Sequence, residues 1–186
     1  MDFITLTPDQ KCVILFNINQ PLEIPLPEFN NKWWPLVTNI WTTFNYKYHV
    51  NGDSWKTYIC HFNKYKQSST RKEGIPSEKC RKLIIWPANL CFAKIKVTQF
   101  VAEQKIWVER YHDSPDHTHI LEDSERLKRS QAIRTLVENE AIKNYSSPEI
   151  VRVVKEYVTE KLDLDSSVKE LRRTEIANIK YKTHRN

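Results

Sequence analysis

The sequence contains only two glycines, Gly52 and Gly74, among 186 residues. Glycine adopts positive φ angles without steric cost, so its scarcity limits tight chain reversals and places these two residues at defined turns. The sequence also lacks any run of roughly 18 apolar residues, the length that a membrane-spanning helix needs. Its first residues lack the basic and then apolar order of a secretory signal. We therefore expect no membrane association and an intracellular protein.

The sequence has four cysteines, and no catalytic pattern stands out. A reducing compartment disfavours a disulfide framework, which leaves metal binding or simple burial for the four cysteines. Asp163 and Asp165 are close in sequence, but they lie at a junction between two expected helices, where aspartate commonly caps a helix. We expect no enzymatic activity and no small-molecule substrate. The four cysteines are Cys12, Cys60, Cys80 and Cys91.

The net charge of +6 is distributed unevenly along the chain. Residues 60–110 carry 11 lysines and arginines against 4 acidic residues. Residues 1–59 have a net charge of −1, and residues 111–186 have a net charge of zero. A local surplus of this size attracts phosphate groups. It is equally typical of a solvated basic loop without a partner, so the charge alone leaves both interpretations open.

The middle of the chain has the alternation that predicts β-strands. Asn51-Gly52 lies between two β-prone segments, and this dipeptide is the strongest short-range hairpin signal because both residues tolerate positive φ. Residues 63–88 are basic and interrupted by glycine and proline, so we expect mostly loop there. Successive strands joined in this way predict an antiparallel meander. The expected strands are 43–50, 54–62, 83–86, 90–100 and 105–112.

The two ends of the chain have different patterns. Four prolines within residues 1–30 argue against helix and favour an extended arm or an edge strand, so residues 1–40 form an N-terminal segment. After the strands, apolar residues recur with helical spacing. The sequence therefore predicts an α+β fold: a small antiparallel sheet of four to five strands within residues 41–121, followed by a helical tail over residues 122–186. The three expected helices are 123–143, 147–162 and one beginning at Ser167, where Ser-Val-Lys-Glu reads as a capping box.

The segment "WVERYHDSPDHTHIL" (107–121) places His117 and His119 one residue apart. Side chains at i and i+2 of an extended segment share a face, so both imidazoles can point at one ion. Cys60 ends an expected strand and Cys91 begins another, and thiolate plus imidazole is the ligand set that Zn²⁺ prefers. Buried cysteines and chance histidine pairs are the alternative explanation.

Other side chains compete for places in such a site. Cys80 is the rival first ligand, because its spacing to Cys91 is tighter than that of Cys60. Cys60 is favoured since the end of a strand fixes its direction. His61 and His112 are weaker candidates, and Cys12 is interpreted as a small buried hydrophobic residue.

Four motifs in order, "YIC", "LCFAKIKV", "KIWVERY" and "DHTHIL", resemble the WRKY and glial-cells-missing superfamily of zinc-dependent DNA-binding domains. Within it, residues 41–121 are most similar to the FLYWCH fingers and to the DNA-binding domains of Mutator-like transposases and far-red-impaired-response proteins. Thr118 replaces the asparagine usual between the two histidines, and the loop between the cysteines is longer than in plant WRKY proteins. The resemblance implies one Zn²⁺ ion held by Cys60, Cys91, His117 and His119.

The resemblance also implies a DNA-reading strand, the one that precedes Cys60. Its matching residues are Tyr46, Lys47, Tyr48 and His49, although the WRKY heptapeptide itself is absent. Strand alternation places the two tyrosines on one face, packed on the sheet, and Lys47 and His49 on the other, facing outward. Phosphate contacts set affinity and orientation without reading sequence. We expect them from Lys64, Lys66, Arg71, Lys72, Lys79, Arg81, Lys82, Lys94 and Lys96.

Together these features predict zinc-dependent, sequence-specific binding of double-stranded DNA in the nucleus, by a transcription regulator or a transposase-derived protein. Two alternatives remain open. The chain could be the N-terminal DNA-binding part of a Mutator-like transposase, or a zinc-stabilised protein-interaction module that pairs with a partner or a second copy, as a homodimer, through its C-terminal helices. The six tryptophans could stack on single strands, but core packing is their more frequent role.

Overall fold

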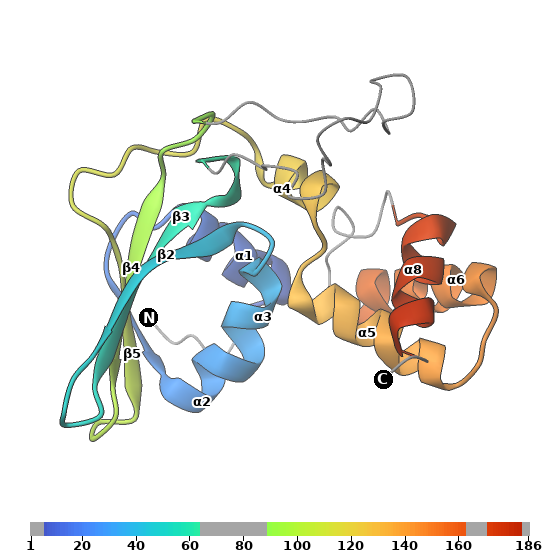
Figure 1. Cartoon of the computed structure of the whole chain (residues 1–186), viewed down its shortest axis with the longest axis horizontal. Helices are drawn as coiled ribbons and strands as arrows, with labels where there is room; N and C mark the ends of the chain where they lie inside the picture. The colour runs from blue at the N-terminus through green and yellow to red at the C-terminus, as the bar shows by residue number, and fades with distance from the viewer. Residues whose placement is uncertain (1–5, 64–88, 163–170, 184–186) are drawn as a thin grey trace, which may run out of the picture.

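The computed structural model describes residues 6–63, 89–162 and 171–183. It contains an open five-stranded antiparallel sheet with strand order β1-β5-β4-β3-β2, and the C-terminal helices form a second lobe beside it (Figure 1). The predicted α+β class, with a small antiparallel sheet followed by helices, is confirmed. The strands are β1 (Leu22–Pro25), β2 (Trp41–Tyr48), β3 (Ser54–Cys60), β4 (Lys94–Phe100) and β5 (Lys105–Arg110).

Strands β2 to β5 are successive antiparallel neighbours, so the predicted meander is confirmed. β4 begins four residues later than expected, and the strand expected at 83–86 lies outside the described residues. Gly52 has a φ of +88° in the turn between β2 and β3, a conformation that glycine adopts without strain. Asp53 Oδ1 accepts the backbone N–H of Val101 at 2.8 Å, which ties this turn to the turn between β4 and β5.

The N-terminal segment is largely helical, which corrects the prediction of an extended arm. Helix α1 (Pro8–Phe16) precedes β1, and α2 (Leu26–Glu28), the π-helical turn η2 (Phe29–Trp33) and α3 (Trp34–Val37) follow it. Prolines begin these helices instead of excluding them, because a proline in the first turn gives up no intrahelical hydrogen bond. Thr7 caps α1 by accepting the backbone N–H of Gln10 at 3.2 Å. The edge-strand part of the prediction is confirmed by β1, which pairs with β5.

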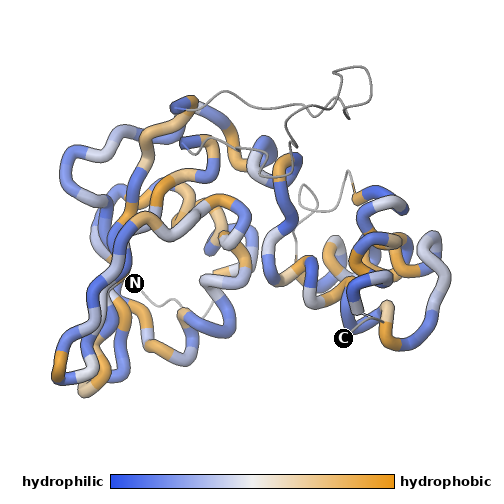
Figure 2. Tube along the Cα trace, viewed as in Figure 1, coloured by the Kyte–Doolittle hydropathy of each residue, from blue (hydrophilic) through white to orange (hydrophobic). Residues whose placement is uncertain are grey.

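One face of the sheet packs on these N-terminal helices, and the core lies between the two layers (Figure 1). Side chains of β4 and β5 alternate between this buried face and an outer face, and hydrophobic and hydrophilic positions accordingly alternate along the chain in Figure 2. Trp33 and Trp41 are buried, so the prediction that tryptophans pack in the core is confirmed for these two residues. Trp34, Trp55 and Trp107 are half-buried, and Trp86 lies outside the described residues. The buried sheet residues include Ile24, Ile95, Val97, Ile106 and Val108.

The chain after β5 forms α4 (Leu121–Leu127), α5 (Gln131–Ile142), α6 (Ser147–Tyr157) with the π-helical turn η5 (Val158–Leu162), and α8 (Arg173–Thr183). The single helix expected at 123–143 is interrupted, because Lys128 is extended and Ser130 caps a new helix. The capping box expected at Ser167 lies outside the described residues. Within the described ranges, no helix is both long enough and apolar enough to cross a membrane.

Candidate functional site

Four side chains from three parts of the sheet converge at one end of it. Cys60 is the last residue of β3, Cys91 precedes β4, and His117 and His119 follow β5. One ligand atom from each lies within 4.8 Å of the others. Both cysteines are buried and both histidines are half-buried. The strand meander therefore brings together residues that are up to 59 positions apart in sequence.

The distances within this cluster match the spacing of ligands around one metal ion. His119 Nε2 lies 3.1 Å from Cys60 Sγ, and His117 Nδ1 lies 3.3 Å from Cys91 Sγ. The two ring nitrogens are 3.2 Å apart. Tetrahedral ligands at about 2.0–2.3 Å from an ion are separated from one another by about 3.3–3.8 Å. The four residues are thus close enough to hold a metal ion, with small adjustments of the side chains.

Hydrogen bonds to backbone carbonyls hold the segments that carry these ligands. The N–H of Cys60 donates to the carbonyl of Ala93 at 3.0 Å, which joins the end of β3 to the segment before β4. Asn63 Nδ2 donates to the carbonyl of Cys91 at 3.0 Å. The hydroxyl of Thr118, the residue between the two histidines, donates to the carbonyl of Leu90 at 2.5 Å. The ligand geometry therefore depends on neighbouring strands and not on a single loop.

Aromatic side chains enclose the imidazoles. The ring of Phe16, the last residue of α1, stacks on His117 with a centroid distance of 4.0 Å and an interplanar angle of 10°. Trp41 lies 5.0 Å from the same imidazole, and Phe62 lies 4.3 Å from His119. The sequence does not predict a role for Phe16, because its N-terminal prolines argue against a helix there. The Thr7-Pro8 start, with glutamine three residues after Thr7, is the signal that could have revealed it.

Each imidazole has one ring nitrogen in the cluster and one directed away from it. His119 Nδ1 lies 2.9 Å from the carbonyl of Ile120, the kind of contact that orients a metal-binding histidine. His117 Nε2 is buried and has no hydrogen-bond partner among the described residues. His119 is therefore oriented by the backbone, whereas His117 is oriented by ring stacking.

The two thiols influence one another strongly. The pKa of Cys91 lies well below its ordinary value, because the Cys60 thiol donates a hydrogen bond to it and both imidazoles contact it. The same contact, together with burial, raises the pKa of Cys60. Burial lowers the pKa of His119, but its contacts with Cys91 and the Ile120 carbonyl outweigh burial, so the pKa is raised overall. One sulfur is thus already favoured as the thiolate, the form that binds metals.

The other cysteines and histidines considered as metal ligands lie apart from the cluster or outside the described residues. Cys80, the rival ligand, is outside them. His61 and His112 are not members of the cluster. Cys12 is buried, as predicted, with its thiol 3.9 Å from the carbonyl of Leu36, and burial raises its pKa.

The strand expected to read DNA is exposed on both faces. Lys47 and His49 are exposed, as predicted, but the prediction that the tyrosines pack on the sheet is wrong, since Tyr46 is 59% and Tyr48 is 64% exposed. Their rings contact each other at 5.6 Å. The reason is that the β2–β3 and β4–β5 turns extend beyond the helices that cover the sheet, so nothing in the described chain covers this end of β2 (Figure 1).

The other predicted phosphate contacts divide into two groups. Lys94 and Lys96 are half-exposed on the outer face of the sheet, and register places Lys47 on the same face. Lys96 Nζ lies 3.4 Å from Glu109, and Lys94 Nζ lies 5.7 Å from the ring centre of Phe44. The second group falls outside the described residues and comprises Lys64, Lys66, Arg71, Lys72, Lys79, Arg81 and Lys82.

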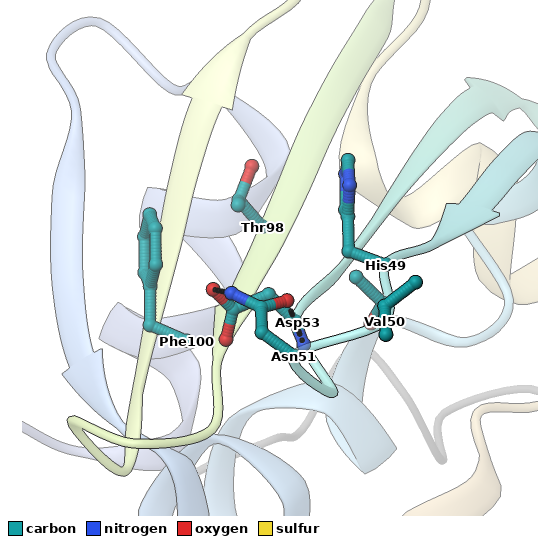
Figure 3. Close-up of a pocket in the computed structure, with 7 residues that line it drawn as sticks. His49, Val50, Asn51, Asp53, Thr98 and Phe100 are labelled. Atoms are coloured by element: carbon teal, nitrogen blue, oxygen red, sulfur yellow. Dashed lines mark hydrogen bonds between the residues drawn. The ribbon is translucent and has the colours of Figure 1, made fainter.

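A shallow hollow of about 480 Å³ lies beside the β2–β3 turn. Its sides include His49 and Phe100, and Thr98 lies between them; all three side chains point to the same side of the sheet (Figure 3). Asn51 and Asp53 form its rim and hydrogen-bond to each other at 2.8 Å. The turn is therefore braced while its outer surface stays open.

Comparison with protein-family models, curated proteins and solved structures gave no match to this chain.

Proposed function

We propose that this chain is a zinc-dependent module that binds double-stranded DNA. The observation that carries the proposal is the convergence of two thiols and two imidazoles within 4.8 Å. Cys₂His₂ is a common ligand set of structural zinc sites, in which all four positions are taken by protein. Mg²⁺ and Ca²⁺ prefer oxygen ligands, so this donor set argues against them.

The residues of the cluster fit Zn²⁺ through Cys60 Sγ, Cys91 Sγ, His117 Nδ1 and His119 Nε2. A bound ion would supply positive charge that stabilises two neighbouring thiolates, which otherwise disfavour each other. It would also join the end of β3, the approach to β4 and the segment after β5. A structural zinc ion contributes about 10 kcal/mol or more to folding in small domains. In this role the ion holds the sheet rigid and takes no part in a reaction.

The exposed end of β2 supports the choice of DNA as the partner. The major groove of DNA is about 12 Å wide and admits β-strands as well as helices. Tyr46, Lys47 and Tyr48 are exposed on β2 at the edge of the sheet, and the exposed His49 follows directly, so hydrogen-bonding side chains can approach bases there. Lys94 and Lys96 lie on the same face as Lys47 and can contact phosphates.

The experiment is fluorescence anisotropy with a labelled 30-base-pair duplex of random sequence, using zinc-loaded protein and protein treated with a chelator. Zinc-loaded protein should bind, chelation should abolish binding, and added zinc should restore it. Contacts with about six phosphates would give a slope near −5 for log K against log salt. Cys60→Ser should lose binding, whereas Cys12→Ser, a buried cysteine outside the cluster, should retain it. Equal binding with and without zinc would refute the proposal.

A further inference from the structure

Helix α8 is the last element described and packs against α5 and α6 in the C-terminal lobe (Figure 1). Ile176 is fully buried against these helices, and Ile179 is partly buried on the same side. Arg129, itself 8% exposed, forms an ion pair with Glu175 at 3.0 Å. The helix is therefore held firmly by one side, and its opposite side faces solvent.

The solvent-facing side of α8, here called the α8 outer face, consists of exposed polar, cationic and small residues. Thr174, Ala177, Asn178 and Tyr181 follow one another at the spacing of a single helical face and are all exposed. Arg173 and Lys182 lie at its margins. Glu175, the acidic residue of α8, is held by Arg129 and is not part of this face. The α8 outer face therefore carries hydrogen-bonding groups and positive charge, with no negative charge.

The cations of α8 differ from those of the two helices beneath it. On α5 and α6 and at the C-cap of α5, three basic residues pair with an acidic residue three or four positions away: Arg134 with Glu138, Lys143 with Glu140 and Arg152 with Glu156. No such ion pair is found for Arg172, Arg173 or Lys182 within the described residues. Among the residues that the structure describes, Arg134, Lys143 and Arg152 are thus paired with acidic residues, whereas Arg172, Arg173 and Lys182 are not.

The position of two of these cations is unfavourable for the helix itself. Arg172 and Arg173 lie at the N-terminus of α8, where the backbone dipole is already positive. Acidic residues stabilise such a position and basic residues do not. Glu175, the acidic residue of the first turn, is paired with Arg129, so Arg172 and Arg173 add side-chain charge to a positive helix end, and this combination favours an anion such as phosphate.

We infer that the α8 outer face is a second DNA-contacting surface, which enters the major groove of the duplex; the inference rests on the proposed function. An 11-residue helix is about 16 Å long, and the major groove is about 12 Å wide. Asn178 and Thr174 present amide and hydroxyl groups to base edges, and asparagine pairs well with adenine. Ala177 allows close approach of the helix, and Arg172, Arg173 and Lys182 contact phosphates.

The test uses the zinc-loaded full chain and the same labelled random-sequence duplex. The triple variant Arg172→Gln/Arg173→Gln/Lys182→Gln removes three unmatched charges, and its matched control Arg134→Gln/Lys143→Gln/Arg152→Gln removes three paired ones. Each phosphate contact contributes about 0.9 to the salt slope, so three contribute about 2.7. Between 50 and 200 mM salt the affinity of the wild type should therefore fall about 40-fold more than that of the α8 variant. The control should keep the slope of the wild type.

A second pair of variants tests entry into the groove separately from charge. Ala177→Trp places a large side chain in the middle of the α8 outer face and should weaken binding at least 10-fold, whereas Asn139→Trp on exposed α5 should leave binding unchanged. Far-ultraviolet circular dichroism verifies that all variants stay folded. Equal effects of the two triple variants, or of the two tryptophan variants, would overturn the inference.

A further triple variant separates this inference from the proposed function. Lys47→Gln/Lys94→Gln/Lys96→Gln removes cations of the sheet. If it weakens binding while the α8 triple does not, the α8 contact is wrong and the proposed function stands. If the α8 triple weakens binding while chelation and the sheet variant do not, α8 binds DNA and the zinc-dependent sheet contact is wrong. Absence of duplex binding by the wild type would refute both.

Discussion

Removal of zinc should lower the melting temperature of the protein, by an amount that depends on the free zinc concentration relative to Kd. The cluster joins three separate segments, and Phe16 stacks on one of its imidazoles, so the ion binds the folded sheet and has no comparable site in the unfolded chain. A ligand that binds only the folded state stabilises it by about 2.7 kcal/mol when its free concentration is 100 times Kd. For a chain of this length, 1 kcal/mol shifts Tm by about 2–4 °C. At this concentration zinc should therefore raise Tm by about 5–11 °C, with a larger rise at higher free zinc.

The assay is differential scanning calorimetry of the apo-protein at increasing free zinc, with bound metal measured in parallel by atomic emission. One zinc per chain should be found, and magnesium should give no shift. Cys60→Ala and His117→Ala should lose both the shift and the metal. Cys12→Ala serves as the matched control, because it truncates a buried cysteine outside the cluster and should keep the zinc-dependent shift. Loss of zinc in Cys80→Ala combined with retention in Cys60→Ala would refute the assignment of the ligands.

Three further outcomes are expected. Phe16→Ala should destabilise the protein by about 3–4 kcal/mol in urea unfolding and weaken zinc binding, because it removes a buried ring stacked on His117. Phe16→Leu should retain most of the stability. Equal zinc affinity in both variants would contradict this expectation. Asp53→Ala should lose the hydrogen bond to Val101 and cost about 1 kcal/mol, with faster hydrogen exchange of the Val101 amide. Gly52→Ala should cost about 1 kcal/mol in urea unfolding because its φ is +88°, and an unchanged midpoint would show that the turn relaxes freely.

Features set by neighbouring residues could be predicted from the sequence. Asn51-Gly52 defines a hairpin through local backbone preference, and alternation defines strands on either side of it. Two histidines one residue apart can share a direction whatever the fold. These local signals, together with the resemblance to a family of zinc-dependent domains, point to the four residues that the fold brings together.

Features set by distant contacts could not be predicted in this way. Phe16 and His117 are far apart in sequence, so their stacking depends on how α1 docks on the sheet. The break before α5 falls in a basic segment without glycine or proline, and it is stabilised by the Gln131 N–H donating to Thr38 Oγ1 at 2.6 Å. The exposure of Tyr46 depends on where the covering helices end, which no alternation pattern reveals.

The proximity of Trp41 to the cluster gives the protein an optical reporter of its own. Its indole is 4% exposed, donates to the carbonyl of Leu15 at 3.1 Å and lies 5.0 Å from the His117 imidazole. A metal ion held by His117 would lie close to this ring and would change the surroundings of the indole. Intrinsic fluorescence should therefore follow occupation of this end of the sheet in real time, without an attached dye.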